Sequence, residues 1–121
     1  MTDYVLPGQE VLIEQDPDFP HAPVGWSRAE AERIAQAEGL ALTELHWRVV
    51  KALQEYFHRH EDVPNIQIRE LHDAMDEAFH ADGGLKRLYE ILPGGPVAQG
   101  CRLAGLKAPA GAVNPSFGSV V

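Results

Sequence analysis

Residues 43–60 read TELHWRVVKALQEYFHRH, and this stretch carries the clearest helical signal in the chain. Its apolar side chains recur at intervals of three and four residues, which places them on one face of a helix: Leu45, Val49, Leu53, Tyr56 and Phe57. Thr43 stands where the helix would open. The basic side chains of residues 58–60 lie near the negative end of its dipole, where positive charge is favourable. The pattern predicts a core helix.

Further helices are predicted on both sides of this one. Upstream, residues 27–30 (SRAE) fit a capping box, in which Ser27 and Glu30 satisfy each other's backbone amides, and Gly39 supplies a stop. Downstream, two amphipathic stretches are separated by a glycine pair at 83–84, and their apolar positions are Ile68, Leu71, Met75, Ala78 and Phe79, then Leu85, Leu88, Tyr89 and Leu92. A last short helix begins at Pro96, carries Cys101 and is capped by Gly105.

The two ends of the chain have different patterns. Tyr4–Leu6 and Val11–Ile13 flank a Pro-Gly turn, which favours a small β-hairpin. Residues 16–25 hold three prolines and are expected to be an extended connection. Residues 106–121 show neither helical nor alternating periodicity. We therefore predict an α+β, mainly α fold: a helical domain over residues 1–105 with an N-terminal hairpin, and a flexible C-terminal arm over 106–121.

Composition and charge limit the kinds of partner that the protein can bind and the places where it can work. The chain has 121 residues, enough for one domain, and its formal net charge of -8 repels nucleic-acid phosphates and anionic membrane surfaces. No apolar stretch approaches the roughly 18 residues of a membrane span, and the N-terminus lacks the pattern of a secretory signal. These features predict a cytoplasmic protein with no membrane contact.

Cys101 is the only cysteine, so any two-thiol chemistry must involve a partner. Its position late in a helix opposes thiolate formation, whereas the neighbouring Arg102 and Lys107 favour it. Val97 lies one turn earlier on the same face. Two interpretations stay open: a reactive thiol, or a half-buried thiol that only packs.

Two other site types are disfavoured. His58 and His60 are two residues apart and point in different directions on a helix, and no second pair completes a tetrahedral set, so the sequence predicts no metal and no cofactor. A helix-turn-helix joined through Glu61–Asn65 would be a DNA-binding unit. Its recognition helix carries four carboxylates, however, which would face DNA phosphates: Glu70, Asp73, Asp76 and Glu77.

The block from Gly95 to Leu106, GPVAQGCRLAGL, followed by KAPAGAV at 107–113, resembles the end of the DsrC/TusE/DsvC family of sulfur-relay proteins. The likeness extends upstream through residues 88–93 and through LTE at 42–44, together with His46, Trp47, Leu53 and Tyr56. In that family the arm closes on Gly-Cys-Val, whose cysteine carries sulfur as a persulfide. In the DsrC type this cysteine also pairs with an earlier one, which Cys101 matches.

The chain departs from the family at the tip of the arm. It reads Gly111-Ala112-Val113 where the family has Gly-Cys-Val, and then continues to Val121. A methyl group cannot hold a persulfide, so the relay through the arm tip and the internal disulfide are both excluded. Cys101 is left as the only thiol able to carry sulfur.

The resemblance implies a carrier or partner protein rather than a turnover enzyme. A second possibility is a regulatory or decoy homologue that docks the same partners without moving sulfur, and a DNA-binding regulator is the third. The implied partners are a DsrEFH- or TusBCD-like donor, a sulfite reductase or a heterodisulfide-reductase-like assembly. The arm residues expected to contact them are Arg102, Leu106, Lys107, Pro109, Gly111, Ala112 and Val113.

Overall fold

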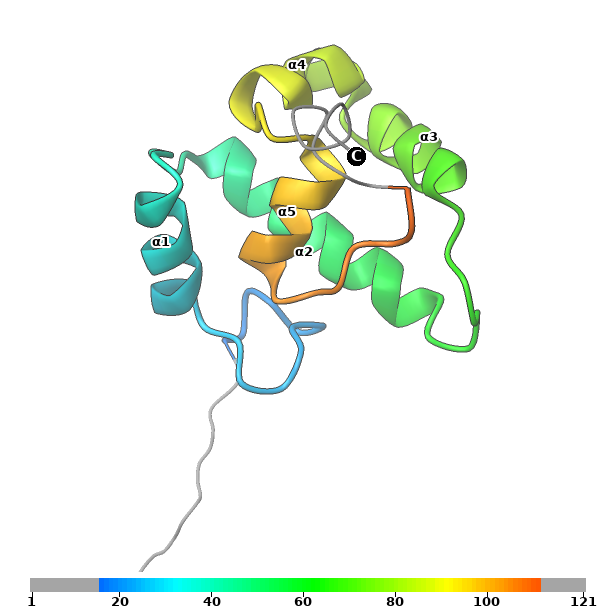
Figure 1. The fold of residues 1–121 in the computed structure, drawn as a ribbon, viewed down its shortest axis with the longest axis horizontal. Coiled ribbons are helices and arrows are strands. Elements are labelled where there is room, and N and C mark those ends of the chain that lie inside the picture. Colours follow the sequence, from blue (N-terminus) through cyan, green and yellow to red (C-terminus); the bar gives the residue numbers. More distant parts are fainter. Residues whose placement is uncertain (1–15, 112–121) are drawn as a thin grey trace, which may run out of the picture.

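The computed structural model describes residues 16–111, and all regular structure in this range is helical. Five α-helices and one 3-10 turn follow one another along the chain (Figure 1). Their bounds are α1 Arg28–Ala37, α2 Glu44–Arg59, α3 Ile68–Ala78, η2 His80–Asp82, α4 Gly84–Ile91 and α5 Pro96–Ala104. The helical part of the predicted fold is confirmed, and the two predicted hairpin strands lie outside the described residues.

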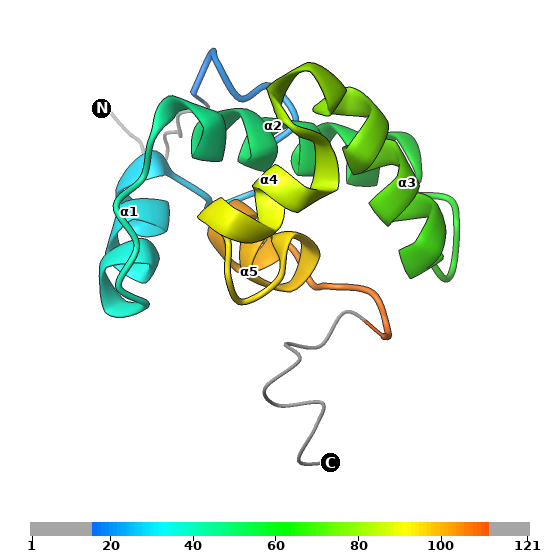
Figure 2. The same ribbon diagram turned by 90° about the horizontal axis from the view of Figure 1, so that it is seen from above.

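Helix α5 lies at the centre of the fold, where it crosses α2 and also contacts α1 and α4 (Figures 1 and 2). Val49 and Leu53 of α2 are fully buried, as the apolar spacing predicts. Helices α2 and α5 approach closely at Gly100, because a Cβ added there would lie 2.7 Å from Leu53 Cδ1. A larger residue at this position would force the side chains of the core to shift. Helix α1 covers one side of α5, and α3 packs against α4.

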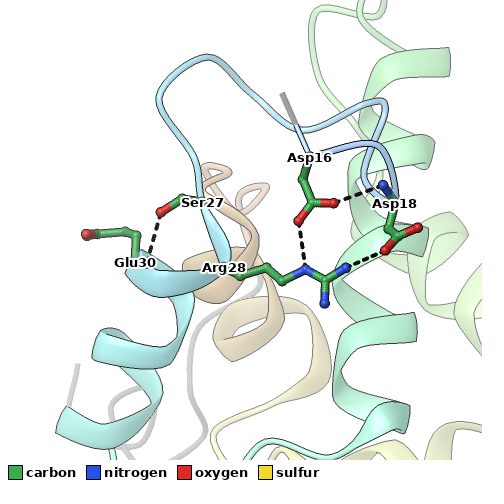
Figure 3. A network of polar contacts seen from close by, with 5 residues as sticks. All are labelled: Asp16, Asp18, Ser27, Arg28 and Glu30. Atoms are coloured by element: carbon green, nitrogen blue, oxygen red, sulfur yellow. Dashed lines mark hydrogen bonds and ion pairs between the residues drawn. The ribbon is translucent and has the colours of Figure 1, made fainter. Parts of the chain in front are cut away.

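The N-terminus of α1 is fixed by side chains on both sides of it (Figure 3). Ser27 Oγ accepts a hydrogen bond from the Glu30 amide at 3.1 Å, but the Glu30 carboxylate pairs with Arg33 and not with the cap. The predicted capping box is therefore only half formed. Arg28 reaches back to Asp16 and Asp18, at 2.7 Å each, and so ties the segment that precedes α1 to the helix.

Helix α2 begins after Thr43, as the sequence predicts, but the role of His46 in its cap was not predicted. The Thr43 amide donates to His46 Nδ1 at 3.0 Å, so His46 takes the place that Glu or Gln has in a capping box. With Nδ1 accepting, Nε2 carries the proton and donates to the Ile91 carbonyl at 2.9 Å. The buried His46 thus links the start of α2 to the end of α4.

In the part of the chain that the structure describes, no helix is both long and apolar enough to span a bilayer.

Candidate functional site

Cys101 lies in α5 with its side chain fully buried in the main apolar cluster of the protein. Burial raises the pKa of the thiol to about 12, and the nearby charge of Arg102 lowers it by a smaller amount. The sequence shows that the helix dipole and the nearby cations act on the thiol in opposite directions, but desolvation is the larger effect in the fold. In this arrangement the thiol is neutral and shielded from solvent.

The direction in which Cys101 points follows from its neighbours on α5. Gln99 and Arg102 both bind Glu38 at the end of α1, whereas the Gly100 position faces Leu53 of α2. Successive residues of a helix are turned by about 100°, so Cys101 points roughly 160° away from Gln99. Its side chain therefore points away from α1. The segment that follows α5 also runs on the side of α5 away from α1 (Figure 1).

Arg102 belongs to a clamp between α1 and α5. Its guanidinium makes two hydrogen bonds to the Glu38 carboxylate, at 2.8 and 3.0 Å, and Gln99 Nε2 donates to the same carboxylate at 2.9 Å. Gln99 Oε1 in turn accepts from the Gly94 amide at 2.9 Å. The hydrogen bond from Arg102 lowers the pKa of Glu38, and the bond to Glu38 raises the pKa of Arg102.

The end of α5 is fully capped. Gly105 adopts a left-handed conformation with φ of 77°, and the Leu106 amide donates to the Cys101 carbonyl at 2.9 Å. Two side chains take the next free carbonyls: Trp26 Nε1 donates to Leu103 O at 2.7 Å, and Gln54 Nε2 to Ala104 O at 3.0 Å. The cap at Gly105 is confirmed. The roles of Trp26 and Gln54 were missed because their partners are far away in the sequence.

The segment after this cap runs beside α2 toward the start of α3 (Figures 1 and 2). Leu106 and Ala108 are half-buried against the core, while Lys107 and Ala110 are exposed. An open groove of about 550 Å³ separates this segment from the connection between α2 and α3. Its lining includes Phe57, His60, Val63, Ile66, Lys107 and Pro109.

The arm residues predicted to bind a partner do not form one cluster. Arg102 is held by Glu38, Leu106 packs inward, and Lys107 and Pro109 line the groove. Gly111 is exposed with φ of 93° at the edge of the described range, and the predicted arm residues at 112 and 113 lie outside that range.

No group of three or more His, Cys, Asp or Glu within residues 16–111 is placed to hold a metal ion. The two histidines near the end of α2 have separate contacts. The His58 ring stacks on His21 with 4.3 Å between centroids, and His60 stacks on Tyr56 at 4.0 Å. Nδ1 of His60 also lies 2.8 Å from the Tyr56 carbonyl.

Comparisons with known proteins give a consistent result. The family model described as DsrC like protein matches residues 7–113. Sulfurtransferase TusE of Pectobacterium atrosepticum is 38% identical over 85 residues, covering 69% of this chain and 76% of that protein. A TusE homolog of Haemophilus influenzae is 36% identical over 104 residues, covering 85% and 93%. The NMR structure of Allochromatium vinosum DsrC matches with a TM-score of 0.59 and 35% identity, covering 73% of this chain and 78% of that one.

Proposed function

The chain belongs to the DsrC-like protein family, and on this premise we propose that it works in sulfur relay. The observation that carries the proposal is the family match over residues 7–113, together with relatives named sulfurtransferase TusE that align over most of both chains. These relatives favour sulfur relay over a helix-turn-helix regulator. The acidic side chains exposed on α3 point the same way.

Cys101 is the proposed carrier because no other thiol exists in the chain. Once exposed, the thiol loses its proton to solvent, and the thiolate attacks the outer sulfur of a persulfide on a donor protein. The new sulfur–sulfur bond forms as the donor's own breaks, and the donor cysteine leaves as a thiolate. The outer sulfur keeps its hydrogen, so Cys101 becomes a persulfide and no oxidant is needed.

The partners we propose are proteins of cytoplasmic sulfur metabolism. A DsrEFH- or TusBCD-like complex would supply sulfur, and a sulfite reductase or heterodisulfide-reductase-like assembly would receive it. Residues 1–105 would form the docking body and 106–121 the arm that reaches a partner. An extended segment rich in proline and glycine orders on a partner at modest entropic cost. The protein then acts as a carrier that passes sulfur on and not as a turnover enzyme.

Mass spectrometry tests the carrier role. We expect the full chain, incubated with a donor protein that bears a cysteine persulfide, to gain the mass of one sulfur atom on Cys101. The gain should disappear on reduction and should be absent from a Cys101→Ser variant. The donor alone and the chain alone serve as blanks.

A failure of sulfur transfer would favour the second candidate function, a regulatory or decoy homologue that carries no sulfur. If partner proteins bind the full chain and no sulfur is transferred to Cys101, the protein is a non-carrying homologue that only docks. Binding of the same partners by Cys101→Ser as strongly as by the parent chain would support that conclusion.

A further inference from the structure

The segment of residues 106–110, called here the strap, is the least firmly held element near Cys101. Its polar anchor is the bond from the Leu106 amide to the Cys101 carbonyl. Within the described range 16–111, residues 107–110 make no hydrogen bond and no ion pair. Two half-buried side chains of the strap, Leu106 and Ala108, also pack against the core.

The other elements that enclose α5 have stronger connections. Glu38 joins α1 to α5 through three hydrogen bonds from Arg102 and Gln99. Arg48 of α2 holds the α3–α4 pair through two hydrogen bonds to Asp82, at 3.0 and 2.9 Å. Elements with few buried contacts and few hydrogen bonds open at the lowest free energy. The strap is therefore the element expected to open first.

The outer edge of the strap is open to an approaching molecule. The groove of about 550 Å³ runs between the strap and residues 61–66, so among the described residues 16–111 nothing packs against this edge of the strap. Cys101 points away from α1, toward the side of α5 on which the strap runs, and the first strap residue, Leu106, donates its amide to the Cys101 carbonyl. Lifting the strap from the core would thus open the side of α5 that carries the thiol, while α1 and α2 stay in place.

We propose that the strap is the cover of Cys101 and that a partner which takes hold of it exposes the thiol. The inference rests on the proposed function, because it explains how a fully buried thiol meets a donor. Docking and exposure are then coupled, because a partner that binds the open strap shifts the protein toward the state in which the thiol is exposed. The thiol stays protected from oxidants and from stray disulfide exchange while the protein is free.

Alkylation of Cys101 by iodoacetamide tests the strap, with the rate followed by mass spectrometry on the full chain under native conditions. Ala108→Glu places a carboxylate on the half-buried side of the strap, and Ala110→Glu makes the same change at an exposed position two residues away. We expect Ala108→Glu to raise the alkylation rate by about tenfold or more, since a carboxylate that loses hydration on the half-buried side of the strap favours the open state. Ala110→Glu should stay within about twofold of the parent, as an exposed carboxylate keeps its hydration.

Two further variants test whether another element, α1 or the α3–α4 pair, covers Cys101 in place of the strap. Glu38→Gln loosens α1, and Asp82→Asn loosens the α3–α4 pair, so neither should match Ala108→Glu. The proposal is overturned if Ala108→Glu leaves the rate unchanged, or if either of the other variants raises it as much. Circular dichroism and the dependence of the rate on low urea separate strap opening from global unfolding, because only global unfolding exposes enough surface for a steep urea dependence. If Ala108→Glu does not fold, Leu106→Ala takes its place with the same expectation.

Iodoacetamide carries no sulfur for transfer, so this result does not depend on the relay. A strap that opens as expected, in a chain whose Cys101 accepts no sulfur, would contradict the proposed function alone. An unchanged alkylation rate in a chain that does accept sulfur would contradict the strap alone.

Discussion

At the scale of single residues, Cys101 shows that burial outweighs local charge. A helix C-terminus, an adjacent arginine and a nearby lysine are all visible in the sequence, and their effects on a thiol oppose each other. Full burial adds a desolvation effect larger than that of the arginine and raises the pKa of Cys101 to about 12. A thiolate is then available only in an open state of the protein.

The raised pKa of Cys101 predicts a loss of stability in alkali. The unfolded chain releases the thiol proton near its ordinary pKa of 9.0, whereas the folded chain holds it until about 12. The contribution to stability is therefore complete below pH 9 and is lost as pH rises from 9 toward 12, by up to about 1.4 kcal/mol for each pH unit. We expect urea unfolding at pH 8, 9 and 10 to show this slope.

A Cys101→Ala variant is the control for that experiment, because lysines and tyrosines also titrate in this range. Only the difference between parent and variant reports the thiol. Parallel stability curves for the two proteins between pH 8 and pH 10 would contradict the raised pKa.

At the scale of elements, the carboxylate of Glu38 joins α1 to α5. It accepts from Arg102 twice and from Gln99 once, and Gln99 also fixes the loop before α5 through the Gly94 amide. Several hydrogen bonds on one partly buried carboxylate are worth more than an exposed ion pair. The clamp sets the position of the helix that carries Cys101.

We expect Glu38→Gln to lower the free energy of unfolding at pH 7 by about 1–2 kcal/mol, because a neutral amide loses the charge-assisted bonds. Glu30→Gln, which breaks the exposed pair with Arg33, should cost less than about 0.5 kcal/mol. Chemical denaturation measures both. An equal effect of the two substitutions would count against the clamp.

The difference in stability between the parent chain and Glu38→Gln should depend on pH. Because the pKa of Glu38 is lowered in the folded state, its contribution is present above the ordinary glutamate value of 4.5 and is lost as pH falls through the lower folded value. The stability curves of the parent and Glu38→Gln should therefore converge in acid.

At the scale of the whole molecule, the net charge disfavours polyanionic partners such as nucleic acids. The net charge is -8, and the helix that would enter a DNA groove exposes several carboxylates. Protein surfaces with local complementarity are compatible with this charge, whereas a phosphate backbone is repelled at long range. The family assignment and the charge thus point to the same class of partner.

We expect duplex DNA to show no binding that weakens with added salt when it is titrated with the full chain. Fluorescence anisotropy of a labelled duplex at low and at physiological salt measures this. Binding at low salt that falls steeply as salt increases would show phosphate contacts, and would reopen the DNA-binding alternative.

Local sequence patterns were enough to predict the helices, the cap at Gly105 and the family. Helical periodicity and capping are local properties, set by residues three or four apart, and the motif from Gly95 to Leu106 is contiguous. The half-formed capping box at Ser27 shows where local prediction fails. Glu30 has a second possible partner, Arg33, and pairs with it and not with the cap.

The depth at which Cys101 is buried, and the residues that surround it, could not be predicted from local patterns. Trp26 and Gln54 cap α5 from 77 and 50 residues away, and Glu38 meets Arg102 across 64 residues. Such contacts depend on how all the helices pack, because burial is the sum of many distant neighbours and no local pattern encodes it. The availability of the single thiol is thus a property of the whole fold.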